Sequence, residues 1–227
     1  MTFRLRDAGP AAVLILWTTL AAGSLLTGFD LFGDRPLSYL GTERGPALLF
    51  SGGLAAAALL LVGFHQYVRD RFPVPSTFSL AMLVGMAGQL VAAVVPIGGD
   101  GLAHRVHTTS ALVLGASLPV LMWRFAAGQP RSPWRHLGYG LFWAEAVACA
   151  VGLWLSARSV APLAEILPAA VFHAWVLVVA FGPRRPAETL GPSHSAPRTR
   201  HAWRSVRTPP ISACRGTRRS CGSGARS

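Results

Sequence analysis

Charge is scarce in this sequence, and lysine is absent altogether. Aspartate, glutamate, lysine and arginine make up 13% of the 227 residues, whereas a typical soluble domain carries about a quarter. Apolar residues account for 52% of the chain. This deficit of charge excludes an ordinary soluble globular domain and predicts a membrane protein whose charges lie between apolar segments.

Cysteine is also scarce, and the motifs of common enzymes are missing. The three cysteines are Cys149, Cys214 and Cys221, which lack the CxxC spacing of a zinc site and indicate no disulfide framework. The sequence contains no Walker loop, no nucleophile elbow and no HExxH motif. The residues therefore give no positive evidence of catalysis. We expect no cofactor and favour a non-enzymatic role.

Six apolar stretches are long enough to cross a bilayer, which requires about 20 helical residues. They predict an all-α polytopic membrane protein with six transmembrane helices in a bundle. The predicted spans are 10–27, 46–67, 78–97, 106–126, 138–157 and 161–181. Together they would form one transmembrane domain, residues 1–182.

Arginine is distributed unevenly over the segments between these spans. One side of the bundle would carry nine arginines, which are Arg4, Arg6, Arg69, Arg71, Arg124, Arg131, Arg135, Arg184 and Arg185. The other side would carry four, which are Arg35, Arg44, Arg105 and Arg158. Because cytoplasmic loops are enriched in arginine, we expect a multi-pass protein of the bacterial inner membrane with both termini in the cytoplasm.

The C-terminal segment, residues 183–227, differs in composition from the rest of the chain. It has ten arginines against one acidic residue and is rich in proline, serine and glycine. Such a segment cannot bury a core and is expected to be a disordered cytoplasmic tail. Anionic lipid headgroups are its expected partner, and nucleic acid is not. A gene read in a shifted frame would have a similar composition, so the native frame of this segment stays open.

Small residues at four-residue spacing predict close packing between helices. Ala81, Gly85 and Gln89 follow this spacing in the third span, and Ala111 and Gly115 follow it in the fourth. Such faces let two backbones approach each other in a membrane. The same spacing predicts that Gln89 lies inside the bundle.

One carboxylic acid and one histidine lie deep within the spans, where ionisable residues are costly and are candidates for function. Glu145 belongs to the fifth span, and His173 lies near the middle of the sixth. With Gln89, they could contact a ligand inside the bundle. Alternatively, Glu145 could pair with an arginine whose side chain reaches toward it, and His173 could bind a backbone carbonyl freed by a helix kink at Pro168.

The loop between the first two spans, residues 28–45, gathers polar residues on the side predicted to face outward. It contributes four candidate ligand-binding residues, which are Asp30, Asp34, Arg35 and Ser38. His107, at the start of the fourth span, would face the same compartment. These residues could line an outward polar pocket. Alternatively, the loop only covers the ends of the first two helices.

A metal site is the alternative interpretation of the same side of the protein. His104 and His107 are three residues apart, so they would share a helix face, and Asp34 and Asp100 could complete a site. The spacing fixes no third ligand. On this interpretation the protein would be a membrane-embedded metal-dependent hydrolase.

Part of the sequence resembles a known family. FDLFGDRPLSYLGTERG, the apolar span after it and GQLVAAVVPIGGDGLAHRVHTTSALVLG are similar to the bacterial membrane family catalogued as domain of unknown function nine-nine-eight. The matching positions are Asp30, Pro36, Ser38, Gly41, Pro96 and His107. The resemblance covers residues 28–115, and Gly45-Pro46 stands where the family has Gly-Trp. It implies a six-span fold and no known activity.

The function favoured by these observations is binding or transport of a lipid or a small solute at the outward mouth of the bundle. The lipid bilayer is the expected surrounding, and a small molecule or lipid is the expected ligand. The hydrolase is one alternative, and a structural or assembly subunit of a membrane complex is another. The sequence leaves the oligomeric state open.

Overall fold

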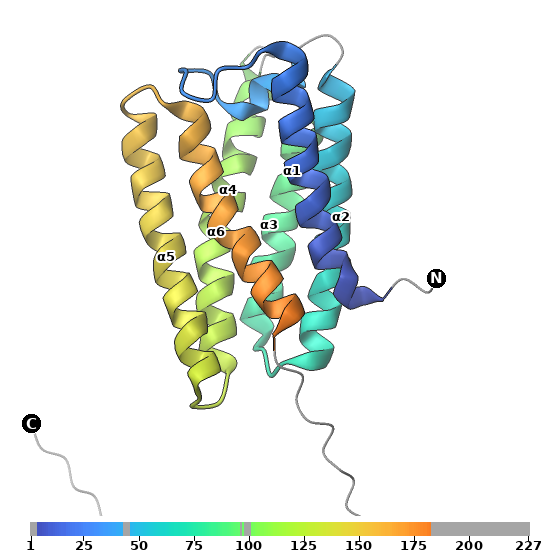
Figure 1. Cartoon of the computed structure of the whole chain (residues 1–227), viewed down its shortest axis with the longest axis vertical. Helices are drawn as coiled ribbons and strands as arrows, with labels where there is room; N and C mark the ends of the chain where they lie inside the picture. Colours follow the sequence, from blue (N-terminus) through green and yellow to red (C-terminus); the bar gives the residue numbers. More distant parts are fainter. Residues whose placement is uncertain (1–3, 43–45, 96, 98–100, 183–227) are drawn as a thin grey trace, which may run out of the picture. The chain divides into compact units, whose positions relative to one another are not determined.

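The computed structural model describes residues 4–42, 46–95, 97 and 101–182, which form helices without a strand. The helices are η1 (Leu5–Asp7), α1 (Ala8–Thr27), η2 (Leu37–Gly41), α2 (Pro46–Arg71), α3 (Ser76–Val94), α4 (Leu102–Gly128), α5 (Pro133–Ser156) and α6 (Ala161–Phe181). The six α-helices are each long and apolar enough to cross a membrane. The predicted all-α, six-span fold is therefore confirmed (Figure 1). The predicted tail, residues 183–227, lies outside the described residues.

Proline and serine set helix boundaries that the apolar pattern does not locate. α5 begins at Pro133, five residues before the predicted start. Ser132 accepts a hydrogen bond from the backbone N–H of Arg135 (3.4 Å), and a proline in the first turn needs no N–H partner. α3 ends at Val94, because Val95 precedes a proline in the sequence and is extended (φ −102°, ψ 108°).

Glycine permits two close contacts between neighbouring helices. A β-carbon on Gly53 of α2 would collide with Thr19 of α1, and one on Gly85 of α3 would collide with the Ser117 hydroxyl of α4. The absence of a side chain therefore brings these backbones together, which is how helices associate in a membrane. Gly85 thus lies at a helix contact, as its spacing indicates.

The prediction of a matching face on α4 is wrong. Ala111 is exposed, and a β-carbon on Gly115 would meet no atom within 4 Å. The face that meets α3 instead carries Ser110 and Ser117, and a β-carbon on Gly88 would come within 2.7 Å of the Ser110 carbonyl oxygen. Alanine and glycine are frequent on every face of these helices, so their spacing alone does not identify the face in contact.

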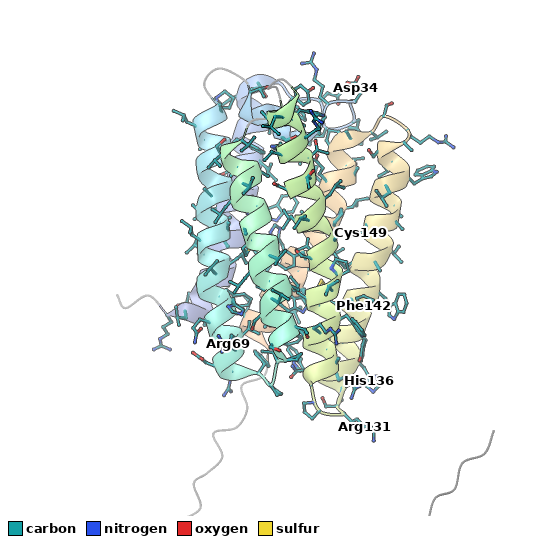
Figure 2. All side chains as sticks on the ribbon, turned by 180° about the vertical axis from the view of Figure 1, so that it is seen from behind. Asp34, Arg69, Arg131, His136, Phe142 and Cys149 are labelled. Carbon is teal, nitrogen blue, oxygen red and sulfur yellow. The ribbon has the colours of Figure 1, made fainter. Side chains whose placement is uncertain are left out.

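The large buried side chains gather in one half of the bundle. They come from the first halves of α1 and α3 and the second halves of α2, α4 and α6, and they include Leu16, Leu61, Phe64, Phe78, Met82, Leu121, Phe125, Phe172, Trp175 and Val176. We call this half the arginine-rich end, because Arg6, Arg69, Arg124, Arg131 and Arg135 lie there. The opposite half, which carries η2, is the loop end. Figure 2 shows Asp34 at the loop end and Arg69 and Arg131 at the arginine-rich end.

Toward the loop end, the hairpin of α5 and α6 diverges from the other four helices. No residue of α6 from 163 to 171 is buried, and none of α4 from 108 to 116 is buried. Each segment makes about two and a half helical turns, yet α4 still contacts α3 at Ser110 and α6 still contacts α5 at Ala164. Figure 1 shows α6 running obliquely, close to α5 at the loop end and toward α1 at the arginine-rich end. The large buried side chains are therefore concentrated at the arginine-rich end, and α4 and α6 bury fewer residues toward the loop end.

The contact between α3 and α4 leads to a test with two glycines. Gly88→Ala should lower the free energy of unfolding by about 1–3 kcal/mol, because the new methyl group meets a backbone carbonyl that cannot move aside. Gly140→Ala is the matched control, because its β-carbon would meet nothing within 4 Å and alanine favours a helix by up to about 1 kcal/mol. Thermal unfolding in detergent measures both. Equal melting temperatures for the two variants would contradict the close contact.

Candidate functional site at the loop end

A tight turn around Asp30 begins the loop after α1. Gly28 ends the helix with φ +64°, a conformation that glycine adopts without strain. Asp30 Oδ1 accepts a hydrogen bond from the Phe32 N–H (2.9 Å), and the Asp30 carbonyl accepts one from the Gly33 N–H (3.2 Å). One carboxylate oxygen of Asp30 is therefore engaged in holding the turn.

Asp34 and Arg35 lie beside a hollow in this loop. Its volume is about 280 Å³, and it is lined by Thr27, Gly28, Phe29, Asp30, Gly33, Asp34 and Arg35. Asp34 and Arg35 are both exposed. Every lining residue comes from one short segment, so the hollow belongs to the loop and not to the space between the helices.

The helix η2 closes part of the loop end with apolar side chains. Leu37 and Leu40 are buried with Phe50 of α2. Leu20 of α1 and Ile166 of α6 pack against them. This small cluster joins α6 to the first two helices, and Leu20 also packs against the main core.

Glu165 attaches η2 to α6. Its Oε2 accepts a hydrogen bond from the backbone N–H of Leu37 (3.0 Å). Glu165 itself is exposed, and its Oε1 has no hydrogen-bond partner among the described residues. Ser38, next to Leu37, has a buried Oγ that makes no hydrogen bond within the described part of the chain. Glu165 Oε1 and Ser38 Oγ therefore both have unused hydrogen-bonding capacity beside the hydrogen bond between Glu165 and Leu37.

The histidines at the start of α4 fasten that helix to the end of α3. Nδ1 of His107 lies 2.6 Å from the Val95 carbonyl oxygen, and Nδ1 of His104 lies 3.1 Å from the Ile97 carbonyl oxygen. A carbonyl only accepts, so each Nδ1 carries the proton and donates it. Among the residues described, no three histidine, cysteine, aspartate or glutamate side chains are grouped to hold a metal ion. Asp100, the fourth proposed ligand, lies outside the described residues.

Gln89 is buried inside the bundle, as its spacing predicts. Its Nε2 donates a hydrogen bond to the Leu54 carbonyl of α2 (3.0 Å). The side chain therefore joins α3 to α2 on the loop-end side of the main core. The Nε2 of Gln89 is therefore occupied by a hydrogen bond that links α3 to α2.

His173 lies at the boundary between the filled core and the open half. The ring is 5% exposed, and its edge meets Trp17 of α1 with ring centroids 5.9 Å apart. Its Nδ1 is buried and has no hydrogen-bond partner in the described part of the protein. The structure thus gives this nitrogen no backbone carbonyl to bind, and its hydrogen-bonding capacity is unused.

Glu165, Ala169 and His173 follow one another at four-residue spacing along α6, so they share a helix face. Glu165 meets η2 at one end of this row, and His173 meets Trp17 at the other. The row therefore faces η2 and Trp17 of α1, and Ala169 contributes only a small side chain between these two contacts. We call the region bounded by this row, η2 and Trp17 the loop-end cleft. The accessible segment 108–116 of α4 lies at about the same level of the bundle.

Glu145 occupies a different place, on the face of α5 that packs against α4 and α6. Glu145 lies seven residues after Gly138 and seven before Gly152. Gly138 meets Ala126 of α4, and Gly152 meets the Ala164 carbonyl of α6. Residues seven apart share a helix face. The side chain is 0% exposed. Its Oε1 lies 3.6 Å from the Cys149 sulfur, and its Oε2 has no partner among the described residues.

The predicted site residues therefore fall into separate groups. Asp30, Asp34 and Arg35 share the loop hollow, Gln89 and His107 join helices, and Glu145 lies between α5 and its neighbours. Ser38 and His173 lie near the two ends of the loop-end cleft. Sequence reasoning missed Glu165 and Ala169 as site residues. Their four-residue spacing with His173 is the signal that could have identified them.

The isolated carboxyl group of Glu145 leads to a test of stability. Glu145→Met should raise the melting temperature in detergent, because it removes a buried polar oxygen without a partner, whose burial costs about 1–3 kcal/mol. Glu145→Ala serves as the control and should lower the melting temperature, because it leaves a cavity. A destabilised methionine variant would mean that the carboxyl group makes a stabilising contact that this arrangement does not include.

The comparisons with known proteins agree with this architecture. A family model described as "Protein of unknown function (DUF998)" matches residues 10–182, which include nearly all of α1 and the whole of the other five spans. Comparison with curated proteins and with solved structures gave no match. The matched region is more than half of the chain, so this six-span membrane protein belongs to the DUF998 family.

Proposed function

We propose that the protein binds a small amphiphilic molecule in the loop-end cleft, beneath η2 and between α6 and the first four helices. The observation that carries this proposal is the uneven filling of the bundle. Large apolar side chains fill the arginine-rich end. At the loop end, no residue of α4 from 108 to 116 or of α6 from 163 to 171 is fully buried. A bundle whose only role was structural would gain stability from filling both halves.

The polar groups along this space support a ligand rather than an empty gap. Glu165 Oε1 and His173 Nδ1 both lack a hydrogen-bond partner among the described residues. They lie eight residues apart on α6, which corresponds to roughly 12 Å along a helix. Ligand sites combine a mainly apolar lining with a few polar groups that orient the bound molecule. Ala169, between them, adds apolar surface without filling the space.

Blocking the cleft tests the proposal. Ala169→Leu places a larger side chain between Glu165 and His173, and alanine and leucine have similar helix propensities. Ala170→Leu is the matched control, because it adds the same atoms about 100° further round the helix. Each protein is purified in mild detergent, and the lipid retained per chain is extracted and quantified by mass spectrometry. We expect several-fold less retained lipid for Ala169→Leu than for wild type and Ala170→Leu. Equal retention by all three proteins would refute the proposal.

We further propose that the loop end faces away from the cytoplasm. Among the described residues, the arginine-rich end carries Arg4, Arg6, Arg69, Arg71, Arg124, Arg131 and Arg135, and the loop end carries Arg35, Arg105 and Arg158. This asymmetry is typical of a protein whose arginine-rich side is cytoplasmic. On this orientation, the cleft opens toward the outer leaflet of the membrane.

Cysteine labelling tests the orientation. Asp34→Cys and Arg131→Cys, each made in a chain whose native cysteines are replaced by serine, place thiols at opposite ends of the bundle (Figure 2). A membrane-impermeant maleimide should label the first in intact cells and the second only after permeabilisation. Labelling of Arg131→Cys alone in intact cells would show the opposite orientation.

A further inference from the structure

We propose that Glu145 is a proton-binding site inside the membrane, and that loss of its proton bends α4 and α6 away from α5 at Pro119 and Pro168. The site is separate from the loop-end cleft, because Glu145 lies on the face of α5 that packs against α4 and α6. Three observations carry the assignment. They are the complete burial of the carboxyl group, the lack of a positive charge beside it, and the positions of the two prolines.

The carboxyl group of Glu145 is held as the neutral acid. The side chain is 0% exposed, and its hydrogen-bond partner in the described part of the chain is Cys149. The Cys149 thiol donates to Oε1 (3.6 Å between sulfur and oxygen), so Oε1 acts as an acceptor. The proton of the acid then belongs on Oε2, which has no partner among the described residues. A carboxylate at this position would lose its hydration and gain no group that replaces it.

The neighbouring helices supply no charge that would stabilise an ionised Glu145. α5 packs against α4 and α6. Residues 108–123 of α4 include no titratable side chain, and residues 166–181 of α6 include only His173, whose ring meets a tryptophan of α1. Arg124, the next residue of α4, lies over the neighbouring tryptophan ring, 4.4 Å from its centroid. The protonated form of the carboxyl group is therefore the one that this arrangement accommodates.

Pro119 of α4 lies at the level of Glu145. Gly138 of α5 meets Ala126 of α4, and Glu145 follows Gly138 by seven residues. α4 and α5 run antiparallel and are joined by a short connection (Figure 1). Seven residues back along α4 from Ala126 therefore lead to Pro119. This proline interrupts the hydrogen-bond ladder of α4, and such a point is where a helix bends.

Pro168 of α6 lies within one turn of the same level. Gly152 of α5 meets the Ala164 carbonyl of α6, and Glu145 precedes Gly152 by seven residues. Seven residues along α6 from Ala164 lead to residue 171, three after Pro168. Because proline has no N–H, the Ala164 carbonyl lacks the helical hydrogen bond from residue 168. Both helices that enclose the carboxyl group are thus weakened beside it.

Release of the proton and bending of the helices are coupled, because a carboxylate needs water or another donor. In the packed arrangement no water contacts Glu145, since its side chain is 0% exposed. Bending at the two prolines admits water to the carboxylate, and return of the proton lets the helices close. The site therefore links pH to the packing of α4 and α6 against α5.

Infrared spectroscopy of protein labelled with ¹³C-glutamate, in nanodiscs, tests the proton. A neutral carboxylic acid has a C=O band that a carboxylate lacks. At about pH 6, where an exposed glutamate is ionised, we expect such a band that disappears in Glu145→Gln. Glu165→Gln is the matched control, because it makes the same change at an exposed glutamate, and it should keep this band. The band should be lost at about pH 9. Its absence at the lower pH, or its persistence at the higher one, would overturn the proton-binding site.

Hydrogen–deuterium exchange tests the bending. Wild type and Glu145→Gln are compared at the same pH, so that the intrinsic pH dependence of amide exchange cancels. Glutamine is neutral at every pH. The amides of α5 should therefore exchange at equal rates in the two proteins at about pH 6, and several-fold faster in wild type at about pH 9. Equal rates at the higher pH, with the infrared band of wild type lost, would show that the proton leaves without bending and would overturn the coupling.

Replacement of both prolines tests where the helices bend. A chain with Pro119→Ala and Pro168→Ala regains both backbone N–H donors, so the difference in exchange between wild type and Glu145→Gln should shrink when it is measured in this background. Pro133→Ala is the matched control, because Pro133 lies in the first turn of α5, where no N–H partner is missing. It should keep the full difference. A full difference in the double variant would overturn the role of the two prolines.

Discussion

The packed core at the arginine-rich end is the constraint on which the rest of the structure depends. Lipid surrounds the helices, so burial of apolar surface does not by itself draw them together, and close van der Waals contact must do so. Phe78, Phe125 and Trp175 supply that contact where α3, α4 and α6 meet, with ring centroids 5.4–6.4 Å apart. Because α6 is held at this end, its other half can diverge from α1 while the fold is preserved.

Sequence patterns predicted the number and type of the helices well, because a bilayer demands long apolar segments whatever their neighbours are. They did not predict which half of the bundle is filled. Leu25 is 85% exposed and Leu40 is 0% exposed, although both are leucines near the same end of the protein. In a soluble protein, polarity separates these two environments. In a membrane, both are apolar, so only the three-dimensional packing distinguishes a core residue from one that faces lipid.

Sequence patterns identified only some residues of the candidate site, because they report local composition and not contacts between distant residues. Gln89 and His173 stood out in the sequence because polar residues are rare inside spans, and both lie within the bundle. Glu165 lies near the end of a span, where a carboxylate is unremarkable. Its importance comes from the hydrogen bond to Leu37, which joins residues 128 positions apart. No local pattern reports such a contact. Likewise, Asp30 was predicted as a ligand residue, but whether its carboxylate holds a turn depends on the backbone geometry that follows it.

The partial exposure of α4 and α6 toward the loop end has a consequence for how this part of the bundle is packed. Residues 108–116 of α4 and 163–171 of α6 are all partly or fully exposed, and both helices are long and apolar enough to cross a membrane, so acyl chains pack against these segments. The internal packing density there is consequently set by the length and unsaturation of the neighbouring acyl chains. Two membranes of different composition would give the same sequence two different interiors, and the spacing between α6 and the first four helices would follow the membrane.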